Sequence, residues 1–421
     1  MKIFCIAIAL ALSSLSLTAQ KLVNAAPADA NMSQQRLTRI DRTIQEYIDK
    51  HWIAGAAAII VKDGKIVYYK AFGYDDTETK TSLRKDAIFR IASQTKAITS
   101  VAAMMLFEEG KFLLDDPLSK YIPEFRNLRV LDKFNEADSS FTTVPAKRQI
   151  TIRDLLTHTS GIDYPLIGSK SMKSIYTKAD IPSGIGTSTR LLATEMKKLA
   201  KLPLKHQPGE AWTYGLNSDL LGYLVEVVSG LSLDQFFKQK IFTPLGMNDT
   251  YFYIPNEKRA RLVKLYTEDS LKRLVKSPDR VGDIVADYPN TDGTFFSGGA
   301  GLSSTAYDYA IFLQMLLNGG AYNGNRILSR SSVRMMTMNQ IGDINLGNKK
   351  FGLGFGITTE RESARIPVGA GSFDWGGYFG TTYWADPKEK IAALILTQQS
   401  PNSHGDILDK FKVLVYQAIN N

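Results

Sequence analysis

The feature that most limits how this chain can fold is the position of its strand-like segments. Two short apolar runs flank the hairpin signal Asp63-Gly64, and three more lie near the C-terminus, at residues 351–357, 381–385 and 391–397. Helical patterns dominate the long stretch between them. A strand needs a paired neighbour, so we expect both ends of the chain to form one sheet, with the middle as an inserted domain.

The predicted fold class is α+β, with a sheet flanked by helices and an inserted, mostly helical domain. The α/β domain is expected to be discontinuous and to comprise residues 35–115 and 290–421, and the helical domain residues 116–289. An amphipathic helix is predicted from Ser33 to Lys50, because Leu and Ile recur there at intervals of three and four residues.

The first 19 residues have the pattern of a signal peptide. Lys2 supplies a positive charge, residues 3–17 are apolar, and Ala19 and Ala25 offer alternative cleavage points. The protein is therefore expected to be periplasmic or secreted, with residues 20–34 as a flexible N-terminal segment. No later stretch reaches the roughly 18 apolar residues of a membrane-spanning helix, so no transmembrane segment is expected.

Cysteine content and charge exclude several kinds of chemistry. The only cysteine, Cys5, lies in the predicted signal peptide, so the mature chain is expected to have no disulfide, catalytic thiolate or thiolate metal site. The four histidines are scattered too widely to indicate a metal site, and we expect neither metal nor cofactor. The formal net charge of +9 is spread along the chain, which indicates a solvated basic surface and no nucleic-acid-binding module.

One segment combines a hydroxyl and an amine at helical spacing. Ser93 stands between a short apolar run and a stretch rich in Ala, Met and Leu that predicts a buried helix. Lys96 lies one turn further on, so its amine and the Ser93 hydroxyl share a face. A helix N-terminus also carries unpaired N–H groups and partial positive charge, which suit an oxyanion. Ser93 is therefore a candidate nucleophile; the alternative is an N-cap serine beside a surface lysine.

Two further patterns contain residue types that are common in catalysis, but we interpret them as parts of the structure without a catalytic role. Ser82 and Lys85 repeat the Ser-x-x-Lys spacing, but they lie in a polar run with no apolar helix behind it, which predicts a solvated loop. His158 lies in a turn after a short predicted helix at residues 152–156 and could be a general base. No carboxylate lies at a sequence spacing that would indicate a hydrogen-bond partner for this imidazole, so we interpret His158 as a residue that braces the turn.

From about residue 35 onward the chain resembles the penicillin-recognising serine hydrolases, a family of class C β-lactamases, D-Ala-D-Ala carboxypeptidases and β-lactamase-like carboxylesterases. The motifs that carry the resemblance are, in chain order, Ser93-Gln94-Thr95-Lys96, Leu155-Leu156-Thr157-His158-Thr159-Ser160-Gly161, Trp212-Thr213-Tyr214-Gly215-Leu216-Asn217, Pro244-Leu245-Gly246-Met247 and Trp375-Gly376-Gly377. The resemblance implies the β-lactamase/transpeptidase-like fold, with an antiparallel sheet and an active site between the two domains. It also implies a small-molecule ester or amide substrate.

Carried over position by position, the resemblance assigns catalytic roles. Ser93 would be the nucleophile, Lys96 would share its proton network, and Tyr214 would take the serine proton and return it to the leaving group. A phenol titrates at about pH 10 in water, so this role needs a cation nearby, and Lys96 is the obvious one. The backbone N–H groups of Ser93 and Tyr378 would form the oxyanion hole.

The tyrosine motif departs from the commonest pattern of the family. The family often has Asn two residues after its tyrosine, whereas Asn217 follows Tyr214 by three, and we assign Asn217 to substrate binding. Tyr288 with Asn290 fits the shorter spacing. The Pro-Gly approach and the helix that follows nevertheless favour Tyr214, and Tyr288 is interpreted as a loop residue.

Trp375 stands where β-lactamases and carboxypeptidases of the family usually present Lys or His. That cation helps to hold a substrate carboxylate, whereas an indole offers apolar area and one N–H donor. Together with Gly376 and Gly377, which let a substrate approach closely, Trp375 resembles the esterase branch, the family VIII-type carboxylesterases. These three residues are therefore expected to bind substrate.

The sequence thus predicts an exported serine hydrolase that forms an acyl-enzyme at Ser93 and hydrolyses carboxylic esters. A β-lactamase and a D-Ala-D-Ala carboxypeptidase or D-aminopeptidase would use the same chemistry and stay open as alternatives. A non-catalytic, penicillin-binding-like scaffold is a third interpretation. An α/β-hydrolase is disfavoured, because the chain contains no Gly-x-Ser-x-Gly motif. The sequence leaves the oligomeric state open.

Overall fold

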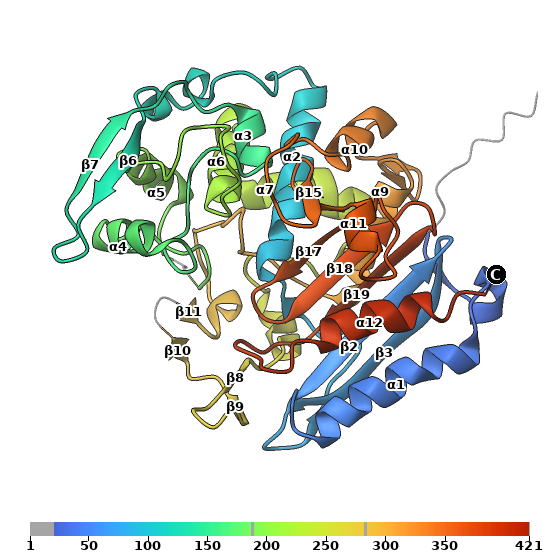
Figure 1. Cartoon of the computed structure of the whole chain (residues 1–421). Helices are drawn as coiled ribbons and strands as arrows, with labels where there is room; N and C mark the ends of the chain where they lie inside the picture. Colours follow the sequence, from blue (N-terminus) through green and yellow to red (C-terminus); the bar gives the residue numbers. More distant parts are fainter. Residues whose placement is uncertain (1–20, 187–188, 282–283, 421) are drawn as a thin grey trace, which may run out of the picture.

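The computed structural model describes residues 21–186, 189–281 and 284–420. Its centre is a nine-stranded sheet (Figure 1). In spatial order the strands are β1 (Val23–Asn24), β3 (Lys65–Asp76), β2 (Gly55–Lys62), β19 (Ile391–Leu396), β18 (Thr381–Asp386), β17 (Phe373–Gly377), β16 (Gly356–Thr358) and β15 (Lys349–Phe351), with β4 (Thr81–Ser82) beside β3. The predicted signal peptide lies outside the described residues, so export stays a prediction.

The two ends of the chain meet in this sheet, as the sequence predicts. β2 pairs antiparallel with β19, with Ala58 opposite Ile395. The sheet is mixed rather than wholly antiparallel, because β1 pairs in parallel with β3. The segment expected to be flexible, residues 20–34, therefore supplies an edge strand and a short 3-10 helix, Pro27–Ala30. The physical reason is that the outer edge of β3 offers backbone groups that an extended segment can pair.

Alternation along β2 divides the core into two layers. Ala58 and Ile60 face one side of the sheet, and Ile59 and Val61 face the other. Because helices cover both faces, β2 reads as a continuous apolar run. The covering helices are α1 (Gln34–Asp49) and α12 (Ile407–Tyr416), side by side on one face, and α2 (Thr95–Glu108) and α9 (Ala306–Leu317) on the other (Figure 1).

The middle of the chain carries many of the predicted helices and several hairpins that the sequence did not predict. Further helices are α3 (Ile152–Leu156), α4 (Lys170–Lys178), α5 (Leu192–Leu199), α6 (Asn217–Ser229), α7 (Leu233–Phe237), α8 (Thr243–Leu245), α10 (Arg330–Met336) and α11 (Glu360–Ser363). The hairpins are β6 (Arg129–Phe134) with β7 (Phe141–Pro145), β8 (Tyr266–Glu268) with β9 (Leu274–Lys276), β10 (Arg280–Val281) with β11 (Ile284–Val285), and β13 (Ala321–Tyr322) with β14 (Asn325–Arg326); β12 (Ser303–Ser304) pairs with β5 (Phe89–Arg90). The hairpins are short and largely exposed, so they leave little hydrophobic alternation to detect.

Several predicted elements can be compared directly with the structure. The first predicted helix is confirmed as α1, whose N-cap Ser33 accepts a hydrogen bond from the Arg36 N–H at 3.2 Å. The strand predicted at residues 351–357 is wrong: β15 ends at Phe351 and β16 begins at Gly356. Gly354, with φ of 93°, lies in the intervening turn, which explains the break. The predicted domain boundaries stay a prediction.

Across the described residues, no single helix is both long and apolar enough to cross a membrane. In the part of the chain that the structure describes, one pair of helices, α6 and residues 233–245, reaches the required length and composition together, and the two halves meet at a bend of 79°.

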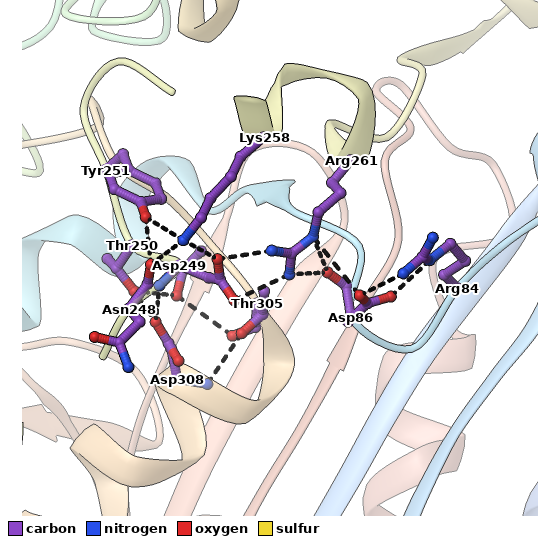
Figure 2. A network of polar contacts seen from close by, with 11 residues as sticks. Arg84, Asp86, Asn248, Asp249, Thr250, Tyr251, Lys258, Arg261, Thr305 and Asp308 are labelled. Atoms are coloured by element: carbon purple, nitrogen blue, oxygen red, sulfur yellow. Dashed lines mark hydrogen bonds and ion pairs between the residues drawn. The ribbon is translucent and has the colours of Figure 1, made fainter. Parts of the chain in front are cut away.

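A polar network at the start of α9 joins segments that are far apart in the sequence (Figure 2). The Asp308 carboxylate accepts hydrogen bonds from the Asp249 N–H at 2.7 Å and from the Thr250 hydroxyl at 3.0 Å. The Asp249 carboxylate in turn pairs with Arg261 at 2.7 Å and with Lys258 at 2.9 Å. Burial raises the pKa of Asp308 to about 7, although these hydrogen bonds oppose the shift.

We expect Asp308 to make the protein less stable as pH rises from about 4 to about 7, because an unfolded Asp titrates at about 3.9. Within that window the native state holds a proton that the unfolded state lacks, so the free energy of unfolding falls as pH increases. The check is the Tm of the wild type and of Asp308→Asn, measured at pH 5 and at pH 7.5. The Tm of the wild type should fall relative to that of Asp308→Asn at the higher pH. A difference that is independent of pH would show that Asp308 does not titrate there.

Candidate active site

Ser93 lies where an unusual backbone leads into a helix. Residues Ala92–Gln94 form a 3-10 turn that continues into α2. Ala92 has φ of 42°, in the left-handed region that non-glycine residues rarely adopt. The end of β17 packs against this turn so closely that a Cβ on Gly377 would lie 2.4 Å from the Ile91 carbonyl oxygen. Ser93 is therefore held between the start of α2 and a strand end that only glycine can form.

The Lys96 side chain lies beneath Ser93 and is buried. Its Nζ donates to Ser93 Oγ at 3.3 Å, to Tyr164 Oη at 2.9 Å and to the Gly299 carbonyl oxygen at 2.7 Å. An ammonium group has three N–H donors and no acceptor, so these three acceptors match its protonated form. Because Ser93 accepts a hydrogen bond from Lys96, its own proton must leave in another direction.

Tyr214 lies on the segment that leads into α6, on the other side of the same ammonium group. Lys96 Nζ is 4.7 Å from the centroid of the Tyr214 ring, and the Trp375 indole N–H donates to Tyr214 Oη at 3.2 Å. Lys96 and Trp375 thus direct a charge and an N–H group at Tyr214, whose hydroxyl oxygen accepts the hydrogen bond from the indole.

Ser93 and Tyr214 line a cavity of about 480 Å³, whereas Lys96 is buried behind its lining. Its lining includes all of the following predicted site residues: Ser93, Tyr214, Trp375, Gly376, Gly377 and Tyr378. β17 supplies three of them, and the N-terminus of α2 and the segment before α6 supply Ser93 and Tyr214. The structure thus brings these residues together, while their catalytic roles stay predictions.

Asn217 is the one predicted substrate-binding residue that does not line this cavity. It is fully buried, its Nδ2 lies 3.0 Å from His158 Nδ1, and its Oδ1 accepts a hydrogen bond from the Ser160 hydroxyl. The expected contact with substrate is wrong in this structure. The extra residue after Tyr214 carries Asn217 into the first turn of α6, which is packed inside the protein.

The two alternative residues considered from the sequence lie outside the cavity lining. His158 is buried and its ring centroid is 5.2 Å from that of Tyr214; burial, with a smaller effect of the Lys96 charge, holds the pKa of His158 well below its usual value. A neutral, hydrogen-bonded imidazole agrees with the interpretation that it braces the turn. Tyr288 is buried in a separate apolar cluster with Ile284 and Phe379.

Tyr164 is a site residue that sequence reasoning missed. Its hydroxyl accepts a hydrogen bond from Lys96, and its ring centroid lies 5.3 Å from that of Tyr214. Burial, and then the charges of Tyr214 and Asp219, raise the pKa of Tyr164 well above its usual value, so it stays a neutral phenol. The only signal in the sequence was its place three residues after Gly161, at the end of the Thr-His-Thr-Ser-Gly motif.

Within the three described ranges, no group of three or more His, Cys, Asp or Glu side chains is placed to hold a metal ion.

A serine hydrogen-bonded to a buried lysine at the start of a helix, a tyrosine that lies close to this lysine and lines the same cavity as the serine, and an adjacent strand ending in glycines define a serine hydrolase of the β-lactamase fold. The comparison with known families agrees: the family described as Beta-lactamase matches residues 40–417. The chain belongs to this β-lactamase family.

Relatives and solved structures extend the comparison. An uncharacterized protein of Mycobacterium tuberculosis is 35% identical over 373 residues, covering 86% of this chain and 89% of that protein. Esterase EstB of Burkholderia gladioli is 29% identical, covering 85% of this chain and 89% of that protein. Among solved structures, EstCE1, described as a hydrolase with promiscuous acyltransferase activity, superposes with a TM-score of 0.78 at 26% identity, covering 91% of this chain and 99% of that one.

Proposed function

We propose that this chain hydrolyses carboxylic esters through an acyl-enzyme on Ser93. The observation that carries the choice of ester is the charge balance of the cavity. Trp375 places an indole where a cation would hold a substrate carboxylate. The two lysines in the described lining are both paired: Lys349 with the Asp374 carboxylate, and Lys412 with Asp409 at 3.2 Å. A neutral acyl group therefore fits this cavity better than an anionic one.

In the first half of the proposed reaction, Tyr214 takes the proton of the Ser93 hydroxyl and Oγ attacks the carbonyl carbon of the ester. The carbonyl oxygen becomes an oxyanion, which the backbone N–H groups of Ser93 and Tyr378 stabilise. Tyr214 then gives its proton to the departing alcohol oxygen as the carbon–oxygen bond breaks. Lys96 remains an ammonium throughout and stabilises the phenolate by its charge.

In the second half, a water molecule attacks the carbonyl carbon of the acyl-Ser93 ester. Tyr214 takes a proton from this water and returns it to Ser93 Oγ, so the carboxylic acid leaves and the enzyme is restored. The net reaction consumes one ester and one water and produces one alcohol and one acid.

Relatives support the same choice and also keep an alternative open. A lovastatin esterase of Penicillium rubens is 30% identical to this chain, covering 89% of this chain and 96% of that protein. A putative D-alanyl-D-alanine carboxypeptidase of Escherichia coli is 28% identical, covering 93% of this chain and 88% of that protein. Amide hydrolysis by the same residues is therefore the second candidate.

The test is a panel of three substrate types with the wild-type protein: p-nitrophenyl acetate and butyrate, nitrocefin, and a peptide ending in D-Ala-D-Ala. We expect kcat/KM for the neutral esters to exceed that for the two anionic substrates by at least about tenfold, because an unpartnered carboxylate forfeits roughly 1.5–3 kcal/mol. Equal or faster turnover of nitrocefin would favour a β-lactamase, and faster release of D-Ala a peptidase.

A further inference from the structure

Lys96 is a buried ammonium group whose direct contacts are all neutral. Its three hydrogen-bond partners are a phenol, a hydroxyl and a peptide carbonyl. Within the described part of the chain, no carboxylate forms an ion pair with it. A buried charge is unfavourable unless an opposite charge lies close enough to offset the loss of water. The structure should therefore contain a carboxylate that acts on Lys96 without touching it.

Asp219 is a buried carboxylate in the first turn of α6, and it interacts electrostatically with Lys96. Only 1% of its surface is exposed. Its Oδ1 accepts hydrogen bonds from the Ser297 hydroxyl at 2.5 Å and from the Gly299 N–H at 3.3 Å. Its Oδ2 has no hydrogen-bond partner among the residues that the structure describes. Burial raises the pKa of Asp219, and the bond from Ser297 and the charge of Lys96 oppose this shift.

A continuous chain of hydrogen bonds connects the Asp219 carboxylate to the Lys96 ammonium. The Ser297 hydroxyl donates to Asp219 and accepts from the Ala300 N–H at 3.0 Å. That N–H belongs to the same peptide unit as the Gly299 carbonyl, which accepts from Lys96 Nζ at 2.7 Å. All the dipoles in this chain point the same way, so each bond polarises the next in the buried interior.

The sequence of the turn fits this arrangement. A Cβ on Gly299 would lie 2.3 Å from Asp219 Oδ2, so the close approach of carboxylate and turn requires glycine. Residues 297–301 are all Ser, Gly or Ala. In the structure this run of small residues connects the two buried charges.

We propose that Asp219 is a positioning residue that serves as the counter-ion of Lys96, acting through Ser297 and the peptide unit between Gly299 and Ala300. It does not touch the substrate; it keeps Lys96 charged and directed at Ser93 and Tyr214. This inference rests on the proposed function, since it assigns Lys96 the role of a permanent ammonium. Among the described residues, the other titratable groups that face this pair of charges are Tyr164, Tyr214 and His158.

The first test is the pH dependence of kcat/KM for a p-nitrophenyl ester in Asp219→Asn. The amide keeps an oxygen that can accept from Ser297 but removes the negative charge. We expect the alkaline limb of the profile to move to lower pH by about one unit, because the ammonium loses its counter-charge. KM should stay within about twofold of the wild-type value, since no contact with substrate is lost. A merely structural role would lower activity at every pH without moving the limb.

Two further variants separate charge from packing. Ser297→Ala keeps the carboxylate but interrupts the chain of hydrogen bonds, and it should move the limb in the same direction by a smaller amount. Asp308→Asn is the matched control, because it removes another buried carboxylate, one that bonds to Asp249 and Thr250 and has no contact with Lys96 (Figure 2). The alkaline limb of Asp308→Asn should coincide with that of the wild type. Thermal unfolding of each variant confirms that it is folded at the assay temperature.

The outcomes distinguish this inference from the proposed function. Suppose that the wild type hydrolyses the ester but that folded Asp219→Asn and Ser297→Ala keep the alkaline limb of the wild type. The role of Asp219 as counter-ion of Lys96 is then overturned, while the proposed ester hydrolysis is supported. If Asp219→Asn does not fold, Ser297→Ala is the deciding variant, and an alkaline limb that does not move again overturns the role of Asp219 as counter-ion. If the wild type neither hydrolyses esters nor is labelled at Ser93 by a fluorophosphonate, both proposals are overturned.

Discussion

Ser93→Ala is expected to lower kcat/KM for ester hydrolysis by at least about a thousandfold. A nucleophile and its base act together in the same step, so losing the nucleophile removes nearly all of the rate enhancement that the two supply. The same variant should not be labelled by a fluorophosphonate, since no oxygen remains to form the phosphonate ester. Removing one small hydroxyl next to Lys96 should leave the fold intact. The measurements are kcat/KM for p-nitrophenyl butyrate and the mass of the protein after labelling.

The chain provides its own matched control for this experiment. Ser82 belongs to the second Ser-x-x-Lys tetrad, and it lies exposed on β4 at the edge of the sheet. Ser82→Ala should therefore keep wild-type hydrolysis and labelling. Substantial turnover by Ser93→Ala would refute the acyl-enzyme mechanism, and a wild type that is never labelled would favour the interpretation of the fold as a non-catalytic scaffold.

Tyr214→Phe is expected to lower kcat by about a hundredfold to ten-thousandfold, the usual effect of losing a general acid–base group. KM should change little, because the phenyl ring still lines the cavity. The variant also leaves the Trp375 indole N–H without its acceptor. A burst of p-nitrophenol followed by slow turnover would show that deacylation suffers more than acylation.

Two other tyrosines calibrate this result. Tyr288→Phe should be nearly silent in kinetics, because that hydroxyl lies outside the cavity and has no hydrogen-bond partner among the described residues. Tyr164→Phe removes one acceptor from Lys96 and should have an intermediate effect, about tenfold, as expected for one hydrogen bond to a charged group. If Tyr164→Phe lowers kcat more than Tyr214→Phe does, Tyr164 and not Tyr214 is the general base.

Much of the fold follows from local pattern. The hairpin at Asp63-Gly64 and the helix that becomes α1 are both visible in the sequence, because a turn signal and a helical period are properties of neighbouring residues. The pairing of β2 with β19 could also be expected, since strands at both ends of a chain need partners. The parallel pairing of β1 at the edge of the sheet could not be expected, because β1 is a two-residue strand with no periodicity to detect.

The candidate site divides in the same way. Ser93 and Lys96 are close in sequence, so helical spacing alone brings them together. Tyr214 and Trp375 came from motifs of the family, and the cavity lining agrees with both. Asn217 was misplaced because one extra residue changes which side of a turn a side chain occupies, and that depends on where α6 begins.

The sequence alone supplied the candidate reactive groups and predicted the helical and strand segments that carry them. What only the tertiary structure decided was how the buried ammonium is surrounded. Tyr164, the Gly299 carbonyl and, through Ser297, Asp219 come from three distant segments. Their types carry no signal of their own, because hydrogen bonding and charge compensation depend on distances in space, and packing of the helices around the sheet sets those distances.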